Sequence, residues 1–399
     1  MFIVILSTIL LLAHLYVWKR AVKDTTAPGR TRWILTGVFV ALAVLLFSTL
    51  MVPRFFGVAE SPIFAWPGYL WFALFGYLLL CLLLLEPVRL VLRVWVKRQP
   101  TPAAEPVIAE EPVETTPAAP ALNRRVFLAR TSAVAAGAGA VGLVGVGAAT
   151  ALGPPDMLQV PISLRRLHPA FNGFRIAVVS DIHLGPLAGR KHTERIVRMI
   201  NETEPDLVAI VGDLVDGSVE ELGPAAEPLR DLVSREGTFF VTGNHEYFVE
   251  DTAEWLRELE RLGVQPMQNE HTVIRRGGAA FDLVGVNDIS GEERSQPPDY
   301  DRALSGVDPS RPTVLLAHQP VMVTESAARG VDLQLSGHTH GGQTWPFQYI
   351  VKAVNPSLAG LSTVDDTQLY VSRGAGFWGP PVRVGAPPDI SILSLNAGR

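Results

Sequence analysis

Residues 174–183 read FRIAVVSDIH, a short apolar run that ends in an aspartate and a histidine. Two later runs have the same design, residues 206–213 (DLVAIVGD) and residues 238–246 (TFFVTGNHE). Runs of four to eight apolar, β-branched or aromatic residues bounded by turn residues are typical of buried strands. Functional groups collect beyond the carboxyl ends of the strands in open α/β sheets. Three strands that each end in residues able to bind a metal therefore predict a shared site.

The same arrangement recurs further along the chain. Residues 312–317 (PTVLLA) precede His318, and residues 331–335 (VDLQL) precede the run SGHTHGG. The segments 192–202 and 251–262 are expected to be helices between strands. Strand–helix–strand units form right-handed crossovers, so a largely parallel sheet in an α/β domain is expected.

The blocks Asp-x-His, Gly-Asp, Gly-Asn-His-Glu, a lone His after a strand, and Gly-His-Thr-His follow one another in this order. Together they resemble the five blocks of the calcineurin-like metallophosphoesterases, over about residues 171–395. The resemblance implies a four-layer α/β/β/α metallophosphoesterase sandwich, here preceded by an all-α transmembrane region. It also implies an enzyme that hydrolyses phosphoester bonds, either phosphodiesters or phosphomonoesters, with two metal ions.

The same resemblance implies seven metal ligands, which are Asp181, His183, Asp213, Asn244, His318, His338 and His340. Asp213 would bridge a first metal, bound by Asp181, His183 and His340, to a second metal bound by the other three. Two cations about 3.5–4 Å apart activate water and clamp phosphoryl oxygens. Imidazole, carboxylate and amide ligands without thiolate suit divalent or trivalent Mn, Fe or Zn better than Mg or Ca.

Three residues are expected to be catalytic by resemblance: His245, Asp213 and Asn244. His245 would protonate the leaving oxygen or stabilise the transition state, and general acid catalysis contributes roughly 10²–10⁴-fold. Asp216 has two readings, support of the bridging carboxylate or a cap on the following segment. The sequence assigns no role to Glu246.

The amino-terminal part of the chain has the composition of a membrane region. The chain is 48% hydrophobic and 18% charged, and residues 2–18, 33–52 and 69–92 form long apolar runs. These runs predict three spans. Basic residues after the first and third runs indicate cytoplasmic loops. The spans show no charge pairs that would suggest transport, so they are expected to be an anchor or sensor.

A Pro/Ala/Glu-rich segment is predicted to be a linker. The Arg124–Arg125 pair and the Ala/Gly/Val-rich run after it resemble a twin-arginine-type export signal, or equally a fourth transmembrane helix. Cleavage at Ala151 and an uncleaved anchor both remain open. Both readings predict a multi-pass protein of the bacterial cytoplasmic membrane with its catalytic domain outside. The predicted parts are residues 1–98, 99–122, 123–153 and 154–399.

The carboxyl-terminal segment 372–383 resembles a block of the membrane-linked bacterial subgroup of this family. That subgroup includes phosphodiesterases with twin-arginine-type signals and relatives that cleave the pyrophosphate of UDP-diacylglucosamine. Two roles are open for the nearby aromatic residues Trp345, Phe347, Phe377 and Trp378. They would form an apolar lip that receives a lipid-linked phosphoester, or they would pack at the rim of the core. Arg373 or Arg383 would either clamp a phosphate or pair with a carboxylate.

Several partners and functions are disfavoured. The net charge of −5 argues against a nucleic-acid-binding surface, and the single cysteine, Cys81, excludes an internal disulfide. The membrane and a phosphoester substrate, lipid-linked in the subgroup it resembles, are the expected partners. UDP-2,3-diacylglucosamine-type pyrophosphate hydrolysis and a non-catalytic metal-bound scaffold remain the alternatives.

Overall fold

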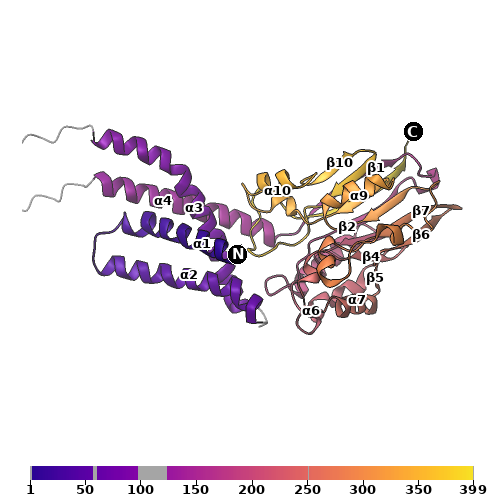
Figure 1. Ribbon diagram of the computed structural model, residues 1–399, viewed down its shortest axis with the longest axis horizontal. Helices are drawn as coiled ribbons and strands as arrows, with labels where there is room; N and C mark the ends of the chain where they lie inside the picture. The colour runs from indigo at the N-terminus through magenta and orange to yellow at the C-terminus, as the bar shows by residue number, and fades with distance from the viewer. Residues whose placement is uncertain (1, 57–60, 98–123, 250, 399) are drawn as a thin grey trace, which may run out of the picture. The chain divides into compact units, whose positions relative to one another are not determined.

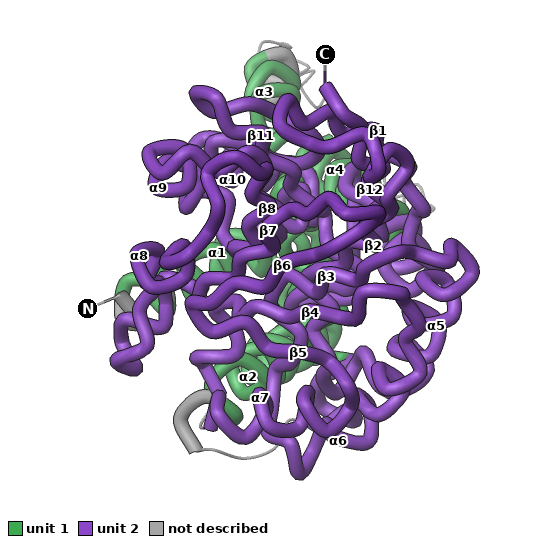
Figure 2. Tube along the Cα trace, turned by 90° about the vertical axis from the view of Figure 1, so that its right-hand side faces the viewer, with its two compact units in different colours: residues 1–56, 67–145 green, residues 57–66, 146–399 purple. Residues whose placement is uncertain are grey.

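The computed structural model describes residues 2–56, 61–97, 124–249 and 251–398. The chain divides into two compact units, coloured separately in Figure 2. One comprises residues 1–56 and 67–145, and the other residues 57–66 and 146–399. The predicted linker 99–122 lies outside the described residues.

The first unit is helical. Its helices are α1 (Phe2–Trp18), η1 (Lys19–Lys23), α2 (Arg30–Phe56), α3 (Pro62–Lys97) and α4 (Arg124–Leu152), although α3 begins and α4 ends in the second unit. Among the described residues, three stretches are long and apolar enough to cross a membrane, Arg30–Pro53, Pro62–Leu92 and Arg124–Leu152. The remaining predicted span, α1, has 17 described residues. The chain thus has the helices of a membrane protein.

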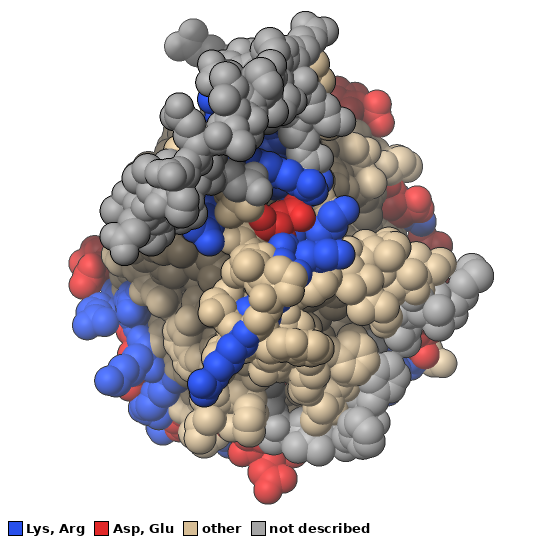
Figure 3. Space-filling view, turned by 90° about the vertical axis from the view of Figure 1, so that its left-hand side faces the viewer, with Lys and Arg blue, Asp and Glu red and all other residues tan. Residues whose placement is uncertain are grey.

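The helical unit contains half-buried ion pairs that the sequence did not reveal. Arg20 lies 3.0 Å from Asp24 and 2.8 Å from Glu86, and Arg89 lies 3.5 Å from Asp24. The expectation that these helices lack charge pairs missed the pairs of Arg20 with Glu86 and of Arg89 with Asp24, because the partners lie more than 60 residues apart in sequence. Lys and Arg side chains gather on the face that Figure 3 shows, around a smaller acidic cluster.

The second unit contains two six-stranded sheets. The first has the order β1 (Asp156–Leu164), β12 (Asp389–Ala397), β2 (Phe174–Val179), β3 (Leu207–Val211), β4 (Thr238–Val241) and β5 (Val264–Pro266). The second has the order β10 (Gly360–Val364), β11 (Thr367–Val371), β9 (Leu333–Ser336), β8 (Thr313–Leu316), β7 (Ala279–Gly285) and β6 (Glu270–Arg276). Both sheets are mixed, with parallel strands at their centres.

Helices cover the outer faces of both sheets (Figure 1). The first sheet packs on α5 (Arg190–Asn201), α6 (Val219–Ala226) and α7 (Thr252–Arg261), and the second on α8 (Tyr300–Ala303) and α9 (Val323–Ala328). Alternation along β2 separates the layers: Ile176 and Val178 enter the core between the sheets, while Ala177 and Val179 face the helices. The predicted four-layer α/β/β/α sandwich is confirmed.

Strand directions determine where the end of α4 lies in the second unit. β1 runs parallel to β12, and β12 runs antiparallel to β2. The first residue of β1 therefore lies at the edge where β2 ends, which is the edge that carries Asp181. The last turns of α4 contact the domain there, since Arg195 of α5 donates to the carbonyls of Leu152 and Gly153 at 2.8 Å each.

Candidate metal centre

The predicted ligands follow the strands in strained backbone conformations. Ten described non-glycine residues have positive φ, and half of them are predicted metal ligands: Asp181, His183, Asp213, His338 and His340. Such conformations are costly for residues with a Cβ and cluster at functional sites. The surrounding fold must stabilise these turns, and the turns bring the donor atoms together.

The first cluster of donors comprises Asp181, His183 and His340, whose ligand atoms all lie within 4.8 Å of one another. The Nε2 atoms of His183 and His340 are 3.0 Å apart, and His340 Nε2 is 3.4 Å from Asp181 Oδ1. Two imidazole nitrogens at this distance can form a hydrogen bond only if one of them carries a proton and the other accepts it. His183 Nδ1 donates to Asp216, so its Nε2 carries a lone pair that a cation at this position would accept.

The second cluster comprises Asp213, His318 and His338, again within 4.8 Å. His318 Nδ1 donates to the carbonyl of Val211 at 2.8 Å, which leaves Nε2 as its lone-pair nitrogen. This buried Nε2 has no hydrogen-bond partner among the described atoms and lies 3.2 Å from Asp213 Oδ2. Asn244 Oδ1 lies 2.8 Å from His338 Nδ1, so the amide joins this cluster.

Asp213 lies between the two clusters. Its Oδ2 is 3.2 Å from His318 Nε2 and 3.7 Å from His183 Nε2. Its Oδ1 accepts a hydrogen bond from the backbone N–H of His245 at 2.9 Å. The donor set and the orphaned Nε2 of His318 therefore fit two metal ions that share this carboxylate.

Two glycines are required by the closeness of the ligands. A Cβ on Gly243 would lie 2.2 Å from Asp213 Oδ1, and a Cβ on Gly337 would lie 2.3 Å from Asp181 Oδ2. Any side chain at either position would displace a ligand carboxylate. These glycines therefore do more than form a turn.

Asp216 supports two imidazoles at once. Its Oδ1 accepts from His183 Nδ1 at 3.0 Å and from His245 Nδ1 at 2.6 Å. Burial opposes the ionised form, yet the two imidazoles hold the pKa of Asp216 below its usual range. The alternative capping role belongs to Ser218, whose side chain accepts from Glu221 N at the start of α6.

His245 is held in a strongly acidic environment. Burial alone would lower its pKa, but the charges of Asp216 and Asp213 raise the pKa of His245 to about 9. Its ring lies 4.6 Å from that of His183, so it borders the first cluster. A protonated imidazole beside the ligands can donate to a phosphoryl or leaving oxygen.

Glu246, to which the sequence assigned no role, shapes the loop that carries Asp213. Its carboxylate accepts from the backbone N–H groups of Asp213 (3.0 Å), Leu214 (2.7 Å) and Gly243 (2.6 Å). Burial and the charge of Asp213 raise the pKa of Glu246 to about 7. Its place directly after His245 is the one signal in the sequence that could have indicated this role.

Both arginines of the carboxyl-terminal segment have partners within the protein. The Arg383 guanidinium is buried and donates to the carbonyls of Gly376 (2.8 Å), His340 (3.1 Å) and Ala386 (3.1 Å). Arg373 pairs with Asp389 at 2.8 Å. Carboxylate pairing explains Arg373, whereas Arg383 stabilises the loop around His340.

The four aromatic residues divide between the two roles considered for them. Phe377 is buried with Ala151 and Ala188. Trp345, Phe347 and Trp378 are exposed.

Trp378 stands next to the catalytic candidate. The Trp378 ring lies 6.1 Å from the ring of His245. The ring of Phe248, which follows His245 in the same loop, lies 5.0 Å from the His245 ring. An aromatic rim therefore borders the metal centre, and it contains Phe248 instead of Phe377.

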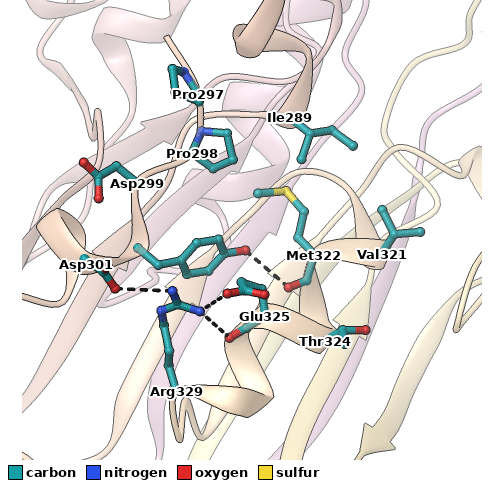
Figure 4. A pocket seen from close by; sticks show the side chains of 11 residues that line it. Ile289, Pro297, Pro298, Asp299, Asp301, Val321, Met322, Thr324, Glu325 and Arg329 are labelled. Atoms are coloured by element: carbon teal, nitrogen blue, oxygen red, sulfur yellow. Dashed lines mark hydrogen bonds and ion pairs between the residues drawn. The ribbon is translucent and has the colours of Figure 1, made fainter.

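A separate pocket of about 500 Å³ lies over the second sheet (Figure 4). Arg329 is the cation in its wall, and it pairs with Asp301 at 3.2 Å and with Glu325. None of the seven predicted ligands lines this pocket. Its one cation is paired with acidic residues of the same wall, so the metal centre remains the candidate functional site.

Comparison with known proteins agrees with this centre. The family model for calcineurin-like phosphoesterases matches residues 174–342. A zebrafish (Danio rerio) "transmembrane protein with metallophosphoesterase domain" is 33% identical over 411 residues, covering 99% of this chain and 89% of its own length.

Two further relatives match about three-fifths of this chain. The bovine (Bos taurus) protein of the same name is 42% identical over 264 residues, and an uncharacterised Helicobacter pylori metallophosphoesterase is 40% identical over 247 residues. These alignments cover 63% and 61% of this chain, and 60% and 65% of the respective relatives. With a match along nearly the whole zebrafish protein, the chain belongs to the calcineurin-like phosphoesterase family and is a metal-dependent phosphoesterase.

Proposed function

We propose that this membrane-anchored enzyme hydrolyses a phosphodiester or phosphomonoester bond of a lipid-linked substrate in the cell envelope. The observation that carries the proposal is the position of the metal centre. The seven donors collect at the edge of the sheets at which α4, a candidate span, joins the domain. A site at this edge is close to substrates held in the membrane.

The residues of the centre support a direct hydrolysis. Asp181, His183, Asp213, Asn244, His318, His338 and His340 would hold two ions of Mn, Fe or Zn. When bound, such ions supply an activated water and polarise the phosphoryl group. His245 donates through Nδ1 to Asp216, which leaves Nε2 to hold the proton that the leaving oxygen needs.

The first test is metal content together with hydrolysis of bis(p-nitrophenyl) phosphate and p-nitrophenyl phosphate by the detergent-solubilised full chain. Asp213→Asn should lose both metal and turnover, because the bridge is lost. His245→Ala should retain metal and lose about 10²–10⁴-fold in turnover. A wild-type chain with two metals and no turnover on either ester would refute a general phosphoesterase.

The two alternatives predict different results in the same assay. A UDP-2,3-diacylglucosamine-type pyrophosphate hydrolase would release UMP from a UDP-linked acylated sugar and ignore the aryl esters. A metal-bound scaffold would hold two ions and turn over none of the three substrates. The His245–Asp216 pair favours catalysis, since a scaffold does not need an oriented imidazole.

We also place the catalytic domain on the outer side of a bacterial cytoplasmic membrane, with α4 as an uncleaved anchor. The basic residues Lys19, Arg20, Lys23, Arg30 and Arg32, which lie between the first two apolar segments, support this orientation by the positive-inside rule. Ala151 is buried against Phe377, so a protease would have to unfold the end of α4 to reach it. Protease protection in spheroplasts and the mass of the mature protein test these two statements.

A further inference from the structure

The helix α10 (Gln348–Val354) is an unusual element of the catalytic unit because it buries none of its residues. Its apolar side chains face outward: Tyr349 is 66% exposed, Ile350 60% and Val354 69%. Phe347, directly before the helix, is also exposed. A contiguous apolar surface on a folded domain is typical of a contact with a membrane or with another protein.

The charges around α10 indicate which partner. Acidic residues make up 39 of the 399 residues of the chain, yet residues 341–361 and 374–388 contain none. Lys352 provides a cation within α10. Aromatic and aliphatic side chains combined with a basic residue, and without acidic ones, are typical of helices at the boundary between lipid and water.

The surface is connected to the metal centre through Trp378. Gln343 donates to the carbonyl of Trp378 at 2.9 Å and accepts from its backbone N–H at 3.0 Å. Gln343 therefore joins the loop beside His245 to the segment that leads into α10. Trp378 and the α10 region form one surface, which we define as Trp345, Phe347, Tyr349, Ile350, Val354 and Trp378.

The same surface is attached to the end of α4. The backbone N–H of Trp345 donates to the carbonyl of Val384 at 2.9 Å, and the N–H of Arg383 donates to the carbonyl of Gly147 at 2.9 Å. Gly147 packs so closely on this loop that a Cβ would lie 2.5 Å from Val382. Only five residues separate Gly147 from the end of α4, about 8 Å along a helix. The candidate span thus leaves the lipid next to this surface.

We infer that the surface defined above rests in the headgroup layer of the bilayer that α4 crosses, and that it holds the metal centre over lipid phosphates. The bilayer is the occupant that fits, because α4 fixes its level and the surface lacks acidic side chains. The docking itself does not depend on the proposed function. Only the consequence for lipid substrates rests on it.

Fluorescence quenching in lipid nanodiscs that hold one chain each tests the docking. In a Cys81→Ser background, Ile350→Cys or Val233→Cys carries an environment-sensitive label. Val233 is a matched control because it is 67% exposed and precedes β4, at the opposite edge of the sheet from the metal centre. The discs contain phosphatidylcholine and phosphatidylglycerol with a headgroup spin label.

The label at position 350 should be quenched at least threefold more than the label at position 233. Equal quenching at the two positions would overturn the inference. It would mean that α10 lies in water or packs against another part of the protein. One chain in each disc excludes a second copy as the source of shielding.

A matched pair of substrates tests the consequence for catalysis. Hexadecyl and ethyl p-nitrophenyl phosphate share the leaving group, but only the first partitions into vesicles. Ile350→Glu should lower the hexadecyl-to-ethyl rate ratio at least fivefold, and Val233→Glu should not. An unchanged ratio would refute the role of the surface in substrate access. A wild-type chain that hydrolyses neither ester would refute the proposed function, while the quenching result would still decide the docking.

Discussion

At the scale of single residues, Asp216 links the metal ligand His183 to His245 through one carboxylate oxygen. Asp216→Asn keeps the shape and removes the charge, so hydrolysis should fall about 10–100-fold, as for other groups that orient a metal-bound histidine. The loss should be greater for phenyl phosphate than for p-nitrophenyl phosphate, because p-nitrophenolate leaves without a proton. Steady-state rates of the variant and the wild type on both esters measure the two losses. The exposed Asp365→Asn is the control, and equal losses on both esters would refute the link to His245.

Glu246 acts on the backbone, so its removal should reduce stability as well as activity. Glu246→Gln replaces an acceptor-only carboxylate by an amide whose NH₂ would face backbone N–H donors. We expect the free energy of unfolding to fall by about 2 kcal/mol, because buried backbone N–H groups lose their acceptor. Thermal unfolding without added metal measures the change. The exposed Glu260→Gln should stay within about 0.5 kcal/mol of wild type, and a similar value for Glu246→Gln would contradict this role.

At the scale of elements, α4 contacts the catalytic domain through Gly147. In Gly147→Leu the new side chain would collide with Val382 and Val384, and overpacking of this kind costs about 1–3 kcal/mol. The thermal unfolding midpoint should therefore drop. Gly142→Leu changes the same helix where a Cβ has no neighbour within 4 Å, so it should leave the midpoint unchanged. Equal midpoints for the two variants would show that the contact at Gly147 is not needed.

At the scale of the whole molecule, metal binding should stabilise the catalytic unit, because its ligands come from loops that only the folded sheets bring together. Metal at 100 times its dissociation constant adds about 2.7 kcal/mol to the free energy of unfolding. Thermal unfolding of the full chain should therefore shift upward with Mn or Zn and return after chelation. Asp213→Asn should not respond to metal, and a response equal to that of wild type would refute the bridging role.

The sequence by itself determined the family resemblance, the central strands and the residues expected to bind metal. This succeeded because strands buried on both faces read as continuous apolar runs, and the residues that end them are local in sequence. The ends of β2, β3, β4, β8 and β9 could each be read without knowledge of the others. The outer strands β1, β6 and β10 were not predicted, since half-exposed strands have weaker patterns.

Only the tertiary structure decided how distant residues act together. Asp216 was ambiguous until folding placed it against His183 and His245, and the ion pair of Arg20 with Glu86 joins residues 66 apart in sequence. The position of the last residues of α4 at the edge that carries Asp181 follows from the parallel pairing of β1 with β12, which lie near opposite ends of the catalytic unit in sequence. Such pairing depends on long-range packing of the sheets. Local composition and spacing therefore do not predict which strands pair.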